Sequence, residues 1–341
     1  MSTGWRLAPD GSPGSILADC LTAALAAPSV HNSQPWLFRL YDGAVAVLAD
    51  PSRQLPLVDS QARELTISVG AAVLNLRVAI LAHGRVPLLH LLPPGGDPRL
   101  LARVTLGPYV PANETARLLA RAIPHRHTNR RPFRDVPVPP EVLEELSAAA
   151  SSEHGELVAV DPALRDAVFG IARTAEHRRR NDPQYWMELG RWTRHTPDRR
   201  DGVPPEAFGP WPVLESVPIR DFGLVEPANR RAVRQFEHEP TVAVLYTDGD
   251  GPREWLRAGQ ALERTLLTAA IRGVATTLMT QPLEIPELRA LLADPITGRT
   301  PQAIIRVGYG PPSPPTPRRP LSDVLLGPDP AARLQPAVRR G

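Results

Sequence analysis

The chain has 341 residues; its 39 basic residues are all arginine and its net charge is +3. This length allows about two domains, and a hydrophobic share of 42% argues against disorder even though 41 residues are proline. Cys20 is the single cysteine, which excludes an internal disulfide and a cysteine cage for a metal, and a charge of +3 is weak support for nucleic-acid binding.

Hydropathy and the chain start indicate a cytoplasmic protein without a membrane partner. Residues 1–14 lack the apolar core of a secretory signal. The most apolar stretch, residues 65–82, contains Asn75 and Arg77 and is too short and too polar to span a bilayer. Clusters such as Arg178–Arg180 are expected to be solvated helix ends, so no nucleic-acid partner is expected either.

The first third of the chain alternates between predicted helices and strands. Apolar residues recur with helical spacing over residues 15–27 and 63–82, and residues 114–122 form a shorter predicted helix. Short apolar runs predict strands at residues 36–40, 44–48, 88–92 and 102–106.

A second set of predicted elements follows. Its helices are expected at 139–150, 164–179, 255–272 and 286–293, and its strands at 156–160, 241–247 and 303–309. Residues 311–320 are proline-rich and are predicted to run extended over the surface. Residues 181–239 carry seven aromatic side chains among many Pro, Gly and Arg, and such a long irregular segment is typical of a lid or binding loop.

The order of elements favours helices packed on sheets, in an α+β or α/β fold. Each half has a leading helix, a strand or hairpin, a long apolar helix and a final strand, which suggests an internal duplication. The sequence has no G-x-G-x-x-G after a strand, no Walker motif, no H-E-x-x-H and no G-x-S-x-G. Rossmann, kinase, zinc protease and serine hydrolase functions therefore lack support.

One segment concentrates cationic groups. In an extended chain Arg126, Thr128 and Arg130 fall on one face, so two guanidinium groups and a hydroxyl would converge as a phosphate clamp. A solvated basic loop is the alternative. A metal site at His125 and His127 is less favoured, because no cysteine or acidic ligand is nearby.

A second polar segment joins the first helix to the first strand. It contains four polar residues within six positions and could present amides to the edge of a polar heterocycle; they are Ser29, His31, Asn32 and Gln34. The alternative is a turn capped by its own side chains. A Ser–His nucleophile pair is not favoured, because no orienting acid accompanies it.

Together these motifs resemble the nitroreductase-like flavoproteins. The resemblance rests on Arg-x-Thr-x-Arg at 126–130 with Pro132-Phe133 and a proline-led helix, on Ala-Pro-Ser-x-x-Asn-x-Gln-Pro-Trp at 27–36, on the helix at 258–270 with the turn through Gln281, and on the last strand with Arg318-Arg319 beyond it. The overall pattern is most similar to the Acg-like branch, in which two such halves are fused, and covers roughly residues 15–325.

The resemblance implies an α+β, nitroreductase-like fold: an internally duplicated pseudo-dimer with helices around antiparallel-type sheets. Residues 15–120 would form a degenerate half, and residues 121–325 the half that binds the FMN phosphate, with a lid insertion at about 181–239. The clamp occurs only in the second half and the Ser-His-Asn loop only in the first. One flavin per chain, in a monomer, is therefore expected.

The resemblance also implies roles for ten residues, all of them cofactor-binding. Arg126 and Arg130 would hold the FMN phosphate, with Thr128 on the phosphate or ribityl chain. Ser29 and Asn32 would reach the isoalloxazine or ribityl from the other half. Leu278, Met279 and Thr280 would turn backbone amides towards flavin N5, and Arg318 or Arg319 would add to the phosphate site.

Two departures from the family pattern bear on these roles. One extra residue stands between Arg130 and Phe133, so the clamp could slip by one position. The turn at Leu278-Met279 lacks the family's Trp and Gly-Gly.

The implied function is an NAD(P)H-dependent oxidoreductase that passes hydride through FMN to a small-molecule acceptor. The flavin would carry the chemistry, so neither a catalytic side chain nor a metal is expected. The alternative is a flavin-binding or flavin-sequestering protein of little turnover, with residues 181–239 as a lid over the flavin.

Overall fold

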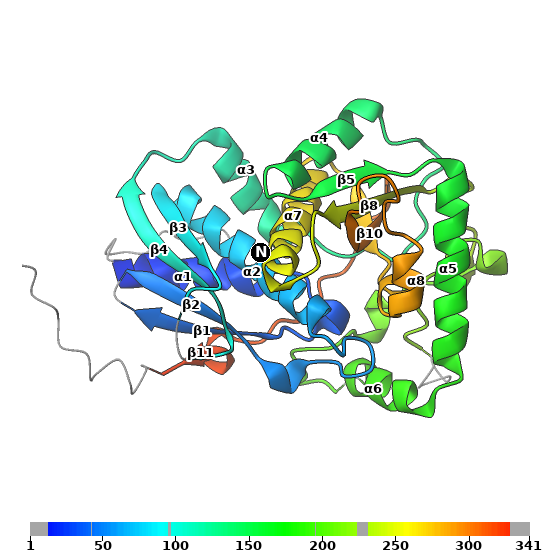
Figure 1. Ribbon diagram of the computed structural model, residues 1–341, viewed down its shortest axis with the longest axis horizontal. Coiled ribbons are helices and arrows are strands. Elements are labelled where there is room, and N and C mark those ends of the chain that lie inside the picture. Colours follow the sequence, from blue (N-terminus) through cyan, green and yellow to red (C-terminus); the bar gives the residue numbers. More distant parts are fainter. Residues whose placement is uncertain (1–12, 42, 95–96, 195, 224–230, 328–341) are drawn as a thin grey trace, which may run out of the picture.

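The computed structural model describes residues 13–41, 43–94, 97–194, 196–223 and 231–327 (Figure 1). The expectation about a secretory signal rests mostly on residues 1–12, which lie outside the described residues, as do part of the segment 181–239 and the chain beyond residue 327. Two β-sheets lie on either side of a central pair of helices, α2 (Arg63–Ala82) and α7 (Pro252–Ile271). This arrangement is α+β, as expected.

The first sheet has the order β11-β1-β2-β4-β3. It is formed by β1 (Trp36–Tyr41), β2 (Ala44–Ala49), β3 (Arg85–Leu91) and β4 (Leu100–Tyr109), all antiparallel to their neighbours. The last strand of the chain, β11 (Leu325–Leu326), pairs parallel to β1 at the edge (Figure 1). The C-terminal segment thus crosses back to the N-terminal half, which the sequence analysis did not predict.

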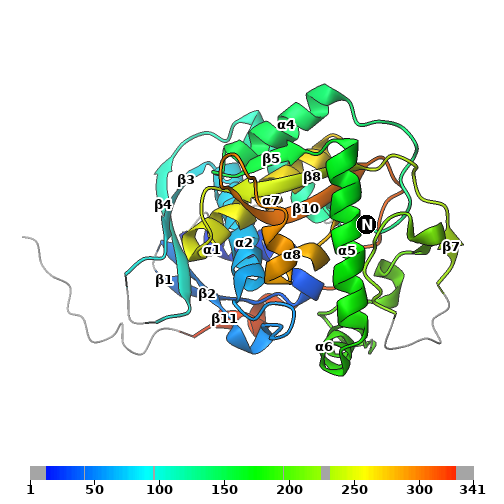
Figure 2. The ribbon, with the colours of Figure 1, turned by 45° about the vertical axis from the view of Figure 1, so that its right-hand side comes forward.

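The second sheet has the order β5-β8-β10-β9 and is antiparallel throughout. Its strands are β5 (Glu156–Ala159), β8 (Thr241–Thr247), β9 (Ala275–Leu278) and β10 (Thr300–Gly308). Alternate residues of β8 bury themselves on opposite faces: Ala243 and Leu245 in the core with α7, Val242 and Val244 in a core with α5 (Pro162–Arg180). Both faces are therefore covered, and α5 lies along one of them (Figure 2).

The two central helices approach each other at a pair of glycines. A Cβ on Gly259 would stand 2.0 Å from the Ile67 carbonyl oxygen, and one on Gly70 would stand 2.4 Å from the Leu256 carbonyl oxygen. Only glycine permits backbones this close. Leu256 and Leu267 of α7 join the core of the first sheet, and Ile67 of α2 joins that of the second.

The segment 181–239, here called the lid segment, is more ordered than predicted. Its first part is α6 (Pro183–Thr193), capped by the Asp182 side chain, and further on β6 (Trp211–Pro212) pairs with β7 (Val233–Arg234). Four of its aromatic side chains, Tyr185, Trp192, Phe208 and Phe222, form a core with Val30 and Leu55 of the first half. An irregular segment is therefore the wrong description of residues 183–193.

The remaining helices lie close to their predicted positions. They are α1 (Pro13–Leu25), α3 (Glu114–Ala122), α4 (Pro140–Ser151) and α8 (Pro286–Ala290), with short 3-10 turns at Val30–Asn32, Pro51–Arg53, Ile123–His125, Pro205–Ala207, Val213–Glu215, Gln281–Leu283 and Leu321–Asp323. Residues 311–320 contain no helix or strand, as predicted; each of them is exposed or partly buried, which agrees with a segment at the surface.

One described helix, α2, is long and apolar enough to cross a membrane by length and composition alone. Of its most apolar window, 83% is buried inside the protein, as in the core helix of a globular fold, so this helix is weak support for a membrane span.

Candidate functional site

The cavity lined by most of the predicted site residues, here called the principal cavity, lies where the two halves and the lid segment meet. The space between its lining atoms, open solvent at its mouth included, is about 1130 Å³. Nine of the ten predicted site residues line it: Ser29, Asn32, Arg126, Thr128, Arg130, Leu278, Met279, Thr280 and Arg318. These residues span 290 positions of the chain, so only the fold brings them together.

At one end of the cavity the guanidinium groups of the buried Arg126 and the partly buried Arg318 share one carbonyl. The Arg126 side chain donates to the Ala26 carbonyl oxygen at 3.0 Å, and Arg318 donates to the same oxygen at 3.3 Å. The nearest carboxylate is Glu263 on α7, fully buried, with Oε1 3.4 Å from Arg126 Nε. We call Arg126 and Arg318 the arginine pair.

The positive and negative charges at this end of the cavity do not cancel. Burial, and then the neighbouring Arg126 charge, lower the pKa of Arg318 to about 9, and burial raises the pKa of Glu263 to about 7. Two cations thus face one carboxyl group that holds its own charge weakly. Forked guanidinium donors at a buried, electropositive end of a cavity fit a phosphate.

The predicted partner of Arg126 in the clamp, Arg130, lies elsewhere. Its side chain donates to the Ala207 carbonyl of the lid segment at 2.9 Å and stacks over Phe222, and its charged neighbours are Arg220 and Arg231. Burial is the main reason that its pKa falls to about 10. The expectation that Arg126 and Arg130 converge is therefore wrong: their backbone positions share a face, but their long side chains run to different ends.

The predicted slip of the clamp does not occur. Arg126, Thr128 and Arg130 all line the cavity, whereas Arg131 is exposed. Phe133 is fixed instead, because Arg306 stacks 3.8 Å over its ring. The chain accommodates the extra residue between Arg130 and Phe133 at the protein surface, where Arg131 is exposed.

The loop from Ser29 to Gln34 closes the cavity from the first half. His31, Asn32 and Gln34 adopt positive φ of 48°, 54° and 51°, a left-handed conformation in which Asn and His are the more frequent non-glycine residues. Ser29 Oγ accepts a hydrogen bond from the Gln34 backbone N–H at 2.9 Å. The Ser29 O–H is therefore able to donate into the cavity.

Asn32 supports its neighbours rather than offering free donors. Its Oδ1 accepts from Arg318 at 3.0 Å, while Nδ2 donates to the Gly202 and Pro317 carbonyls. Its amide is therefore committed to positioning Arg318 and the lid segment, and the expected direct contact with a flavin ring is not favoured.

The turn after β9 offers fewer free amides than expected. The Met279 N–H donates to the Ile304 carbonyl at 2.9 Å, so it is not available to a ligand. Thr280 donates its hydroxyl to Glu284 at 2.7 Å. Among the described residues no acceptor takes the Thr280 backbone N–H, so this group can donate to a ligand.

Arg319 is the predicted site residue that does not line the cavity. Its backbone N–H donates to Gln34 Oε1 at 2.8 Å, and its guanidinium donates to the Asp323 carbonyl and lies 3.8 Å from Asp50. Of the two neighbouring arginines, Arg318 alone belongs to the cavity.

Buried polar contacts fasten the lid segment over the cavity. Arg220 pairs with Glu284, and it donates to Tyr185 Oη at 2.6 Å and to Thr280 Oγ1 at 3.0 Å. On the first half, Arg53 pairs with Asp201. Part of the Arg178–Arg180 cluster also serves the fold, because Arg179 donates to the Leu57 carbonyl at 2.8 Å.

Three cavity residues were missed as functional candidates. The sequence motifs include His31 only as a member of its loop, and they do not include Glu64 or Arg220. The signal for Glu64 was its place in the first turn of a long apolar helix, where a buried carboxyl group is unusual. Within the described ranges no group of three or more His, Cys, Asp and Glu side chains could hold a metal.

Comparisons with known proteins agree with this arrangement. The model of the nitroreductase family matches residues 123–309. Two Mycobacterium tuberculosis proteins, provisionally named "NAD(P)H nitroreductase acg" and "NAD(P)H nitroreductase Rv3131", are 32% and 34% identical to the chain over 91% of its length, and the matches cover 95% and 90% of those proteins.

Solved structures are similar to the chain. A provisionally named nitroreductase from Anabaena variabilis aligns over 90% of both chains with a TM-score of 0.51 and 11% identity. A nitroreductase with bound FMN from Desulfitobacterium hafniense aligns over 62% of this chain and 98% of its own, with a TM-score of 0.40 and 14% identity. From its sequence relatives and the family match, the chain belongs to the nitroreductase family, and its fold is the α+β nitroreductase fold.

Proposed function

We propose that this protein binds one FMN per chain in the principal cavity and works, as a monomer, as an NAD(P)H-dependent oxidoreductase on small organic acceptors. The observation that carries the proposal is the arginine pair, a buried and a partly buried cation on one carbonyl with a single weakly charged carboxyl group beside them. A phosphate dianion would balance this charge.

Each described residue then has a definite task. The arginine pair and Thr128 hold the phosphate, and Asn32 keeps Arg318 in place. Ser29 and the Thr280 amide donate to the cofactor's polar atoms. Arg130, partly buried and without a carboxylate within 4.0 Å among the described residues, would stabilise negative charge on a bound flavin ring. When bound, FMN supplies hydride transfer.

The lid segment excludes water from the cavity, and it also supports a second candidate. A lid held by the buried Arg220–Glu284 pair would keep acceptors out, and the protein would then sequester a flavin with little turnover. The two candidates share a cofactor site and differ only in whether the lid segment opens.

The test begins with the colour and flavin content of purified protein. One FMN per chain is expected; two per chain would refute the single site, and a colourless protein that does not take up added FMN would refute the cofactor. Prompt bleaching of the yellow protein by anaerobic NADPH supports the oxidoreductase, whereas a flavin that dithionite reduces and NADPH does not supports sequestration. Gel filtration with light scattering tests the monomer.

A further inference from the structure

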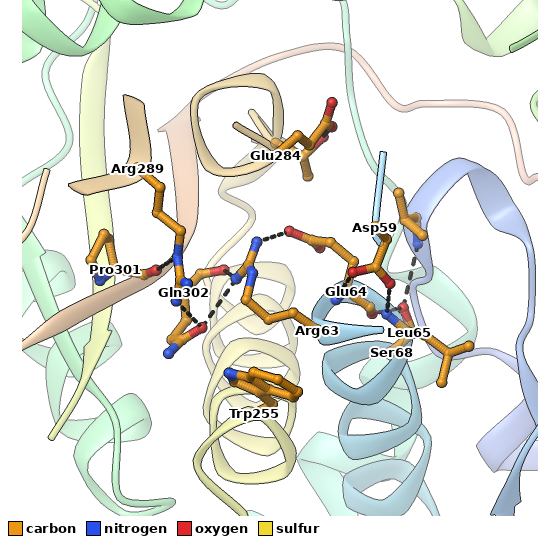
Figure 3. Close-up of polar contacts among 12 residues, drawn as sticks. Asp59, Arg63, Glu64, Leu65, Ser68, Trp255, Glu284, Arg289, Pro301 and Gln302 are labelled. Carbon is orange, nitrogen blue, oxygen red and sulfur yellow. Dashed lines mark hydrogen bonds and ion pairs between the residues drawn. The ribbon is translucent and has the colours of Figure 1, made fainter. Parts of the chain in front are cut away.

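The lid end of the cavity contains a carboxyl group with no assigned task. Glu64 stands in the first turn of α2, is 7% exposed and lines the same cavity as Thr280 and Gln281. Arg63 binds its Oε1, and no described residue donates to its Oε2 (Figure 3). Half of the carboxyl group is therefore anchored, and the other half is unpartnered within the cavity wall.

The anchor itself is rigid. Arg63 donates to the Gln302 carbonyl at 2.9 Å and to Gln302 Oε1 at 3.0 Å, so the guanidinium is fixed to β10 of the second half (Figure 3). Asp59 caps the helix by accepting the Glu64 and Leu65 amides at 3.0 and 2.8 Å. The position of Glu64 is thus determined by contacts from both halves.

The charges around Glu64 favour its protonated form. Burial is the largest effect, and the neighbouring Asp59 and Glu284 carboxylates add to it, while Arg63 and Arg289 oppose it; together they raise the pKa of Glu64 to about 7. Arg126 and Arg318 are not among these neighbours. Glu64 is thus an acid near neutral pH, away from the arginine pair.

Other ionisable groups at this end are poor acids. His31, on the loop of the first half, is held neutral because burial and the Arg220 and Arg130 charges lower its pKa well below its ordinary value. Both of its ring nitrogens are also sealed from solvent without a hydrogen-bond partner. Arg220 of the lid segment is committed to Glu284. Glu64 remains as the group able to exchange a proton with a ligand.

Resting on the proposed function, we propose that Glu64 is the catalytic acid of the second-substrate subsite and protonates the oxygen of a quinone-type acceptor. Conversion of a quinone to a hydroquinone takes up two electrons and two protons. The reduced flavin provides a hydride, which is two electrons and one proton. The second proton leaves the Glu64 O–H bond and forms a new O–H bond on the acceptor, and the carboxylate left beside Arg63 is reprotonated from solvent.

The experiment compares wild type with Glu64→Gln, in FMN-loaded protein reduced by dithionite and reoxidised anaerobically by 2-methyl-1,4-naphthoquinone in a stopped-flow instrument. Because NADPH is left out, the result does not depend on nicotinamide use. General acids typically contribute about 100- to 10,000-fold, so E64Q should slow the step at saturating quinone by about 100-fold with little change in quinone affinity. The wild-type rate should fall as pH rises through about 7, and E64Q should lack this fall.

The matched control is Glu188→Gln. Burial also raises the pKa of Glu188, but this residue binds the Leu57 and Val58 amides outside the cavity. E188Q should keep the wild-type rate and pH profile. An E64Q variant with the wild-type rate and pH profile would overturn the proposal, and so would an E188Q variant that is slowed as much as E64Q.

A second measurement does not depend on turnover. In protein with 13C-labelled glutamate carboxyl groups, Glu64 and Glu263 should both give NMR resonances that titrate near pH 7. The Glu64 resonance should be absent from Glu64→Asp or E64Q protein, and the Glu263 resonance should remain. Wild-type protein in which the Glu64 carboxyl titrates between pH 4 and 5 would refute the acid. Absence of FMN would refute the proposed function while leaving this titration measurable.

Discussion

At the scale of single residues, two adjacent arginines have different surroundings. Arg318 lines the cavity beside Arg126, whereas Arg319 faces Asp50 and Asp323 outside it. Sequence motifs could not choose between them, because both are cations at the same distance from the last strand. Which of the two arginines lines the cavity depends on the side of the backbone from which each side chain projects.

This difference gives a matched pair of variants. Arg318→Met should weaken FMN binding by roughly 10- to 100-fold, since a hydrogen bond to a charged group contributes about 1.5–3 kcal/mol. Arg319→Met should change FMN affinity by no more than about twofold, because a partly exposed ion pair contributes little. Quenching of flavin fluorescence gives both dissociation constants, and equal losses in the two variants would contradict the assignment of Arg318 to the phosphate.

At the scale of elements, a buried ion pair ties the lid segment to the second half. Arg220 of the lid segment meets Glu284 and Thr280 of the second half and Tyr185 of the lid segment itself. Other lid residues pack in a small aromatic core on the first half. A buried pair is costly to break from one side, because the remaining charge has no counter-ion.

We therefore expect Arg220→Met to destabilise the protein by about 3–5 kcal/mol and to loosen the lid segment. The bound flavin should become more accessible to iodide quenching, and its reduction by NADPH should become faster. The double variant Arg220→Met with Glu284→Met leaves no unpaired charge, so it should recover most of the stability while the flavin stays accessible. A flavin as protected as in wild type would show that Arg220 does not hold the lid segment closed.

At the scale of the whole molecule, the crossing of α2 and α7 joins the two sheets. The interpretation of the halves as a pseudo-dimer, residues 15–120 and 121–325, is a proposal supported by this central contact and by the two separate sheets. Because β11, from the C-terminal end of the second half, pairs with β1, the second half also contributes a strand to the sheet of the first half.

Two glycine substitutions test how much the fold depends on the crossing. Gly259→Ala places a methyl group against the Ile67 carbonyl and should cost about 3 kcal/mol or more, since overpacking forces the helices apart. Gly170→Ala is the control: this residue lies within α5 with open space around its Cβ position, so alanine should stabilise the protein by about 0.5–1 kcal/mol. Urea unfolding measures both, and a Gly259→Ala variant as stable as wild type would contradict the close crossing.

The sequence by itself determined the local elements and the identity of most cavity residues. Hydrophobic periodicity located α2, α3 and β8 at their observed bounds, because each has a strong local pattern. The family motifs selected nine residues that line one cavity, since loop residues such as Ser29 and Thr128 belong to short segments with fixed spacing.

The tertiary structure alone decided which of these residues act together. It paired Arg126 with Arg318 instead of Arg130, used the Met279 amide within the sheet, and turned Arg319 away. It also placed Glu64 in the cavity wall and ordered residues 183–193 as a helix. The physical reason is the length of the arginine side chain, which can extend away from its own backbone segment. Its final partner therefore depends on residues that the fold brings near, such as Ala26, which is 292 positions from Arg318.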